Sequence, residues 1–197
     1  MALVTLLAHT PQPELHVAAA AKLCYSPSSI DKIKEGLTEE KVASFVDMLS
    51  EIGHESPIEH ATFTFGIEGV SRALLAQITR HRIASFSVQS QRYVAENAFE
   101  YVLPPQIAAI PEAKEEFIRA MEEDQRHYEN LTNILTAKHK KALLEKGKDE
   151  KTAARMAQKQ AIEDARFVLP NACDTKMIVT LTCQFTHSGT TFKQSLC

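Results

Sequence analysis

The chain has 197 residues, of which 44% are hydrophobic and 24% charged, and its formal net charge is −3 at pH 7. A chain of this length can bury a core of its own, so we expect one globular domain over residues 1–197. The slightly acidic balance, with a pI near 6.2, argues against a general nucleic-acid coat, whose surface would be strongly basic.

The cysteines and the N-terminus indicate the compartment. Four cysteines are scattered without a C-x-x-C pair: Cys24, Cys173, Cys183 and Cys197. This spacing argues against a disulfide framework or a zinc ribbon and predicts free thiols. The N-terminus lacks a cationic leader, and no apolar run approaches the roughly 20 residues that span a bilayer, so we expect a cytoplasmic protein.

Hydrophobic periodicity predicts the elements of the first half of the chain. Residues 2–9 form a short apolar run typical of a strand, and residues 14–25 read as a helix. Apolar side chains spaced three and four apart predict a second helix over residues 38–53. Residues 61–67 alternate as a half-buried strand does, and after Gly69 a helix over residues 71–82 is expected, with Ser71 as its N-cap and Leu74, Leu75 and Ile78 on its core side.

The second half is dominated by helical patterns. A long amphipathic helix is expected from Pro111 to about residue 146, and another from about residue 151 to Leu169 and Pro170. Small residues mark one side of the latter, which predicts close helix packing: Ala154, Ala157, Ala161, Ala165 and Val168. Residues 177–183 read as a strand. Helices and strands without regular alternation predict an α+β fold, with a mixed or antiparallel sheet packed against long helices.

Fixed cations are concentrated in residues 79–93, TRHRIASFSVQSQRY. If the helix continues to residue 82, Gln77, Arg80 and His81 share one face. If the residues that follow are extended, Val88, Ser90 and Arg92 point to one side, and Gln89 and Gln91 to the other. Guanidinium groups donate in pairs to phosphate or carboxylate oxygens, so this segment suits a phosphorylated small molecule. The alternative is a solvated helix end whose arginines pair with surface carboxylates.

Two other clusters suggest chemistry more weakly. His54, Glu55, Glu59 and His60 are possible metal ligands, but they lack H-E-x-x-H spacing and Pro57 interrupts them, so we expect no metal site. Ser90 is interpreted as a hydrogen-bond donor, because no catalytic triad can be recognised from spacing.

Three motifs resemble one family. Arg80-His81-Arg82, followed after seven residues by Ser90-Gln91-Arg92, matches R-H-R-x7-S-x-R, the signature of flavin-dependent thymidylate synthases, the ThyX family. HESPIEH at residues 54–60 and ARFVLP at residues 165–170 resemble two further motifs of that family. The resemblance covers about residues 1–180. It implies a ThyX-like fold and FAD-dependent reductive methylation of dUMP to dTMP, with methylenetetrahydrofolate as carbon donor, NADPH as hydride source, and a homotetramer with shared active sites.

The same resemblance assigns roles to individual residues. The positions that correspond to the dUMP-binding set are Gln77, Arg80, Gln89, Ser90, Gln91, Arg92 and Arg166. Those that correspond to FAD-contacting positions are Ser56, Arg80, His81, Arg82 and Val88. Val88 stands where the family often has Glu or another polar residue.

Residues 181–197 depart from the family pattern. The chain reads LTCQFTHSGTTFKQSLC, which places Thr182 and Gln184 at the positions of an N-x-R element and Ser195 at that of a substrate-polarising arginine. The leading hypothesis is the enzyme, which the intact R-H-R-x7-S-x-R motif favours. The alternative, which the altered residues 181–197 favour, is a non-catalytic flavin- or nucleotide-binding relative that has lost turnover. An RNA-binding module is disfavoured by the pI and by the few aromatic residues near the arginines.

Overall fold

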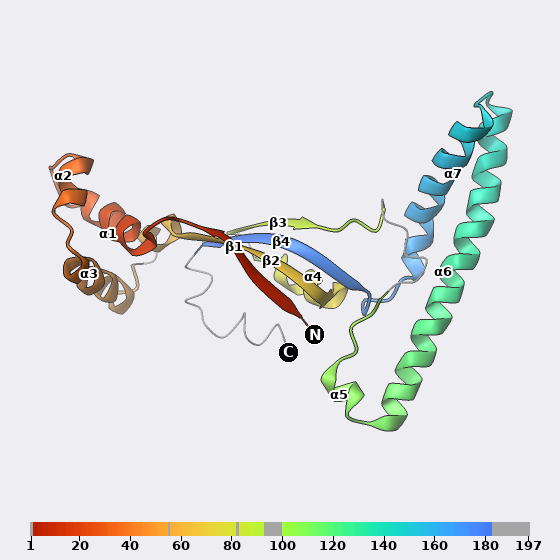
Figure 1. Ribbon diagram of the computed structural model, residues 1–197, viewed down its shortest axis with the longest axis horizontal. Coiled ribbons are helices and arrows are strands. Elements are labelled where there is room, and N and C mark those ends of the chain that lie inside the picture. Colours follow the sequence, from red (N-terminus) through yellow and green to blue (C-terminus); the bar gives the residue numbers. More distant parts are fainter. Residues whose placement is uncertain (1, 55, 82, 93–99, 183–197) are drawn as a thin grey trace. The chain divides into compact units, whose positions relative to one another are not determined.

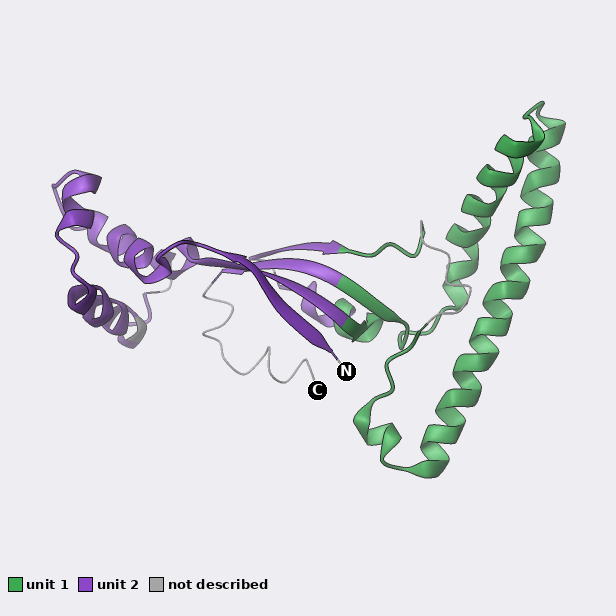
Figure 2. Ribbon diagram, viewed as in Figure 1, with its two compact units in different colours: residues 1, 69–75, 88–176 green, residues 2–68, 76–87, 177–197 purple. Residues whose placement is uncertain are grey.

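A computed structural model of the chain describes residues 2–54, 56–81, 83–92 and 100–182. Figure 2 shows two compact units, one of residues 1, 69–75 and 88–176 (unit 1) and one of residues 2–68, 76–87 and 177–197 (unit 2). Each unit is therefore built from segments that are distant in the sequence. The single domain expected over residues 1–197 stays a prediction.

Four strands form one sheet in the order β1-β2-β4-β3, with bounds β1 (Leu3–His9), β2 (Thr62–Ser71), β3 (Ala84–Val88) and β4 (Asp174–Thr182). Strand β1 pairs with β2 in antiparallel register, from Leu3 opposite Glu68 to His9 opposite Phe63, with an irregularity between Leu6 and Ala8. In β4, alternate residues from Thr175 to Leu181 are buried. The sheet and its accompanying helices confirm the expected α+β class.

Within unit 2, three helices and a short 3-10 helix pack together, with bounds α1 (Pro13–Leu23), α2 (Ile30–Glu35), α3 (Glu39–Glu51) and η1 (Ser56–His60). Helix α1 contacts each of the other three. The core is apolar and is formed by Val17, Ala21, Leu49 and Ala61, with Phe45, Val46 and Ile58 packed against it. The three- and four-residue spacing that predicted α3 therefore marks the face that it buries.

Within unit 1, the long helices α6 (Pro111–Glu145) and α7 (Glu150–Ala165) lie side by side (Figure 1). The short helices α5 (Pro105–Ala108) and η2 (Arg166–Val168) flank them in sequence. On α7 the fully buried small residues are Ala153, Ala157, Ala161 and Ala165. The expected close packing is thus present, but Ala153 takes the place predicted for half-buried Ala154, because a four-residue step keeps one face of the helix.

The remaining helix, α4 (Arg72–Ile78), is shorter than expected. The predicted helix over residues 71–82 ends at Ile78, after which Arg80 and His81 donate main-chain hydrogen bonds to residues three positions earlier. Strand β2 continues to Ser71 through Gly69, whose φ of 69° suits glycine. None of the described helices carries a stretch long and apolar enough to cross a bilayer.

Candidate functional site

The first group of predicted donors follows helix α4. Ser71 caps this helix as expected, because its hydroxyl oxygen accepts a hydrogen bond from the Leu74 N–H at 3.2 Å. At the other end, Arg80 Nη1 donates to Gln77 Oε1 at 3.4 Å, and both side chains are exposed. His81 is half-buried. The shared face expected for Gln77, Arg80 and His81 required a helix that continues to residue 82, but α4 ends at Ile78, so Arg80 and His81 lie beyond it. Arg80 nevertheless contacts Gln77.

The second group lies just after strand β3, which ends at half-buried Val88. The N–H of Gln89 donates to the Lys176 carbonyl of β4 at 3.1 Å. The chain then turns, and the Arg92 N–H donates to Ser90 Oγ at 3.2 Å. The extended alternative for residues 88–92 is therefore wrong beyond Gln89, because the serine hydroxyl offers the main chain a local hydrogen bond that replaces strand pairing. Gln91 lies within this turn and is half-buried.

Two predicted donors from different motifs meet at Glu163, near the end of α7. Arg92 Nη1 lies 3.5 Å from Glu163 Oε1, and both side chains are about half exposed. Arg166 Nε donates to the Glu163 main-chain carbonyl at 3.0 Å, and its guanidinium lies over the Phe167 ring. Glu163 thus connects the S-x-R turn with the A-R-x-V-L-P motif. Glu163 belongs to none of the recognised motifs, and its position three residues before Arg166 is the signal that the sequence offers for it.

The solvated alternative for the arginines receives partial support from the same contact. Arg92 does pair with a carboxylate, and the pair is open to solvent. However, a half-exposed ion pair is weak, and its free energy is typically about 1 kcal/mol or less. A phosphate that approaches from solvent can therefore take over the guanidinium at small cost.

The other predicted site residues are distributed as follows. Ser56 is exposed and begins η1 in unit 2, the unit that also contains Gln77, Arg80 and His81. Unit 1 contains Val88 to Arg92 and Arg166. Arg82, Glu55 and Ser195 lie outside the described residues. In the part of the chain that is described, no cluster of three or more His, Cys, Asp or Glu side chains is arranged to hold a metal ion.

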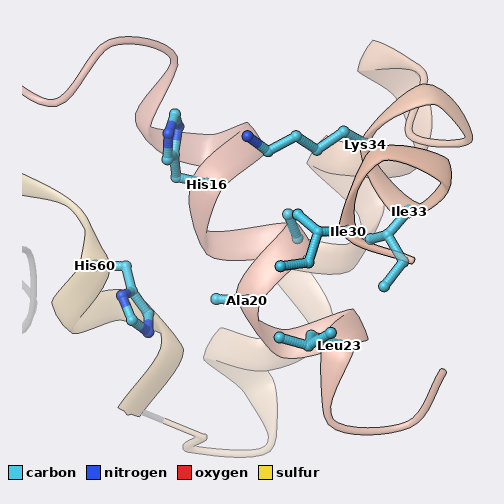
Figure 3. A pocket seen from close by; sticks show the side chains of 8 residues that line it. His16, Ala20, Leu23, Ile30, Ile33, Lys34 and His60 are labelled. Atoms are coloured by element: carbon cyan, nitrogen blue, oxygen red, sulfur yellow. The ribbon is translucent and has the colours of Figure 1, made fainter. Parts of the chain in front are cut away.

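A small cavity of about 220 Å³ in unit 2 was not anticipated from the sequence (Figure 3). Its apolar wall comes from α1 and α2 and includes Leu23 and Ile30, and His60 of the HESPIEH motif lies across from them. His16 and Lys34 add polar groups to the lining. The ring of His16 is oriented by a hydrogen bond between its Nδ1 and the Gln12 carbonyl at 3.1 Å. One residue of a predicted family motif therefore lines a cavity.

The guanidinium and amide donors described above can bind anions. Comparison with known proteins identifies the family to which the chain belongs. The model of the family described as Thymidylate synthase complementing protein matches residues 5–188. The chain belongs to this family. The match continues to residue 188, beyond the expected limit near residue 180.

Curated relatives named flavin-dependent thymidylate synthase are similar over most of this chain. The Clostridium tetani protein is 50% identical over 178 residues, which are 90% of this chain and 68% of the relative. The Nitratidesulfovibrio vulgaris protein is 46% identical over 186 residues, covering 92% of this chain and 69% of the relative. The Pyrococcus abyssi protein is 38% identical over 185 residues, covering 92% and 66%. The chain thus spans about two thirds of the length of these relatives.

Proposed function

We propose that this chain is a flavin-dependent thymidylate synthase that converts dUMP to dTMP, with methylenetetrahydrofolate as carbon donor and NADPH as hydride source. Family membership and 50% identity to a protein of that name support the reaction. The observation that carries the substrate assignment is the approach of Arg92 and Arg166 to the same residue, Glu163. Two guanidinium groups that contact the same residue suit a nucleotide phosphate, which accepts paired N–H donors.

The proposed dUMP site adds neutral donors to these two arginines. It consists of Gln77, Arg80, Gln89, Ser90, Gln91, Arg92 and Arg166. Arginines fix the anionic phosphate, while amide and hydroxyl groups can orient the base and sugar through directional hydrogen bonds. The role of the protein is thus to bind and orient the nucleotide.

The proposed flavin site uses exposed and half-buried donors that fit an anionic dinucleotide. We assign FAD to Ser56, Arg80, His81, Arg82 and Val88. Arg80 is exposed and hydrogen-bonded to Gln77, so its guanidinium is oriented and accessible to a pyrophosphate oxygen. Half-buried Val88 offers apolar contact instead of a polar one. FAD, when bound, supplies the redox chemistry of the reaction, and the residues around it hold and orient it.

The test combines a spectrum with an assay. The purified protein should show the visible absorption of bound oxidised flavin, and it should form dTMP when dUMP, methylenetetrahydrofolate and NADPH are all present. Omission of dUMP is the control. A protein without flavin after reconstitution with FAD, and without dTMP formation, would contradict the proposal.

A non-catalytic role is the second candidate, favoured by one observation on the sequence. Thr182, Gln184 and Ser195 occupy the positions at which the resemblance leads us to expect an N-x-R element and a substrate-polarising arginine. A non-catalytic relative would bind flavin and dUMP yet form no dTMP, even in a single turnover that starts from chemically reduced flavin. Formation of dTMP under those conditions would exclude this role.

We also propose that the chain assembles as a homotetramer with shared active sites. Strand β1 supports self-association, because apolar side chains along it are exposed in the single chain, among them Leu3, Leu6 and Leu7. Contiguous exposed apolar surface typically marks an interface. Sedimentation would give the assembly state. Sharing is tested by mixing Arg80→Ala and Arg92→Ala subunits: recovery of activity in the mixture supports shared sites, and its absence speaks against them.

A further inference from the structure

An arginine outside the three recognised motifs holds the segment that carries the predicted nucleotide donors. Arg72, the first residue of α4, is half-buried, and its Nη2 donates to the main-chain carbonyl of Gln89 at 2.8 Å. We propose that Arg72 is a positioning residue that fixes the Gln89–Arg92 turn for dUMP binding. This inference rests on the proposed function.

The base of the Arg72 side chain is itself firmly anchored within unit 1. The Arg72 N–H donates to the Cys173 carbonyl at 3.0 Å, and the Ala73 N–H donates to the Asn171 carbonyl at 2.9 Å. Cys173 is fully buried and packs in a core with Met121. The first turn of α4 is thus attached to the segment that leads into β4. Because the main chain at Arg72 is constrained, its side chain can hold the Gln89 carbonyl in a defined position.

The acceptor of this hydrogen bond lies where the regular strand ends. Gln89 directly follows β3, and its N–H is bonded to the Lys176 carbonyl of β4 at 3.1 Å. Its main chain is therefore held on one side by the sheet and on the other by Arg72. The next residue, Ser90, begins the turn in which its hydroxyl accepts the Arg92 N–H at 3.2 Å. The direction in which the chain enters this turn is set at Gln89.

An arginine suits this task better than other donors. Its guanidinium is planar and permanently charged, so the bond to the Gln89 carbonyl is charge-assisted and has a defined direction. Without it, the Gln89 main chain keeps its bond to Lys176, and the turn can rotate about that point. Displacement of binding groups by about 1 Å can cost on the order of 10²-fold in an active site. Arg72 therefore acts on the nucleotide through Ser90 and Arg92, without touching it.

The test compares Arg72→Gln and Arg72→Lys with the parent enzyme, each loaded with flavin. Arg155→Gln is the matched control, because Arg155 is exposed on α7. We expect Arg72→Gln to raise the Kd and KM for dUMP by about tenfold or more, with kcat changed less and the flavin spectrum unchanged. Arg72→Lys should restore part of the affinity, since it keeps a charged donor. Hydrogen exchange measured without nucleotide should quicken at the amides of Ser90, Gln91 and Arg92 in Arg72→Gln.

Several outcomes would overturn the inference. A folded Arg72→Gln enzyme with parental dUMP affinity and parental exchange at residues 90–92 would do so. If Arg72→Gln does not fold, Arg72→Lys decides: a raised Kd at the parental Tm supports positioning, and a parental Kd contradicts it. Should the parent itself fail to bind dUMP, the proposed function is wrong, and the exchange data alone then decide whether Arg72 holds the turn.

Discussion

At the scale of single residues, the candidate site is a set of guanidinium groups whose contacts differ in strength. Arg92 is in a half-exposed ion pair with Glu163, whereas Arg166 donates to a main-chain carbonyl of the same residue. A solvent-exposed ion pair contributes about 1 kcal/mol or less, while a charge-assisted bond to a bound anion contributes about 1.5–3 kcal/mol. If Arg92 binds the nucleotide phosphate as proposed, exchange of Glu163 for that phosphate is therefore favourable.

We expect Arg92→Ala to weaken dUMP binding by about 10- to 100-fold, the loss that corresponds to one charge-assisted hydrogen bond. Arg119→Ala is the matched control, because Arg119 is an exposed arginine on α6 that is paired with Glu116 on the same helix. Calorimetric titration of the flavin-loaded proteins with dUMP gives both affinities. Equal affinities in the two variants would remove Arg92 from the site.

Ser90→Ala should lower dUMP affinity without abolishing turnover. The Ser90 hydroxyl accepts the Arg92 N–H, so its removal loosens the turn that presents Arg92. A lost neutral hydrogen bond of this kind costs about 0.5–1.5 kcal/mol, or a few-fold to about tenfold in affinity. Steady-state kinetics with varied dUMP would show a raised KM. Complete loss of activity with dUMP binding intact would instead indicate covalent chemistry at Ser90.

At the scale of elements, the ends of the helices contribute to stability as well as their buried faces. The acidic N-cap of α7, Asp149, accepts a hydrogen bond from the Thr152 N–H at 3.0 Å. The main-chain hydrogen bond from Thr152, followed by one from the Thr152 hydroxyl, holds the pKa of Asp149 below its ordinary value. A group whose pKa is lowered on folding contributes stability above its unfolded pKa, and that contribution is lost as the pH falls through the folded value.

Replacement of Asp149 by Ala should therefore destabilise the protein at neutral pH, and the difference from the parent should shrink below about pH 4, where the unfolded carboxyl is protonated. Asp149→Asn keeps an uncharged cap acceptor, so it should lose less than Asp149→Ala at pH 7. Urea unfolding at pH 7 and pH 3.5 measures both differences. A constant difference across this range would show that the carboxylate form contributes nothing.

The contact between α6 and α7 depends on side-chain size. Ala157 is fully buried on α7, and protein interiors are packed with few voids that could take a larger side chain. We expect Ala157→Leu to lower the free energy of unfolding by about 1–3 kcal/mol through overpacking. Ala137→Leu, at an exposed position of α6, is the control with the same change in chemistry. Urea unfolding would contradict the expectation if both variants matched the parent.

Local signals predicted most of these elements, whereas competing local hydrogen bonds and one long-range contact account for what they did not predict. Ser71 and Pro111 marked two helix starts correctly, because capping and the fixed φ of proline act on neighbouring residues. The early end of α4 and the turn at Ser90 were not predicted, because they depend on hydrogen bonds that compete locally with regular structure. Glu163 was missed because its partner Arg92 is distant in the sequence.

At the scale of the whole molecule, family membership connects motifs that no single contact joins. Motifs spread from residue 54 to residue 170 resemble one family, and the family model matches residues 5–188. Arg72 belongs to none of these motifs, yet it holds one of them. A motif search thus finds the residues that would touch ligands, whereas the structure adds those that support them. Arg82 and Ser195 lie outside the described residues, and the roles assigned to their positions rest on the resemblance alone.

The proposed assembly can be tested through strand β1, whose Leu6 side chain is 50% exposed in the single chain. If tetramer formation covers this strand, Leu6→Glu places a charge in the interface, and an unpaired buried charge costs several kcal/mol, on the order of 3–5 kcal/mol. We therefore expect Leu6→Glu to sediment as a smaller species at micromolar concentration and to lose dTMP formation, because shared sites need neighbouring subunits.

Ile134→Glu is the matched control for that variant, since Ile134 is 64% exposed on α6 and lies on no strand. It should keep the parental sedimentation and activity. Circular dichroism separates dissociation from unfolding, because a dissociated but folded chain retains its helical signal. A parental assembly state in Leu6→Glu would show that β1 stays outside the interface. Dissociation with full activity would show instead that each chain completes its own site, which would contradict the sharing of active sites while leaving the reaction untouched.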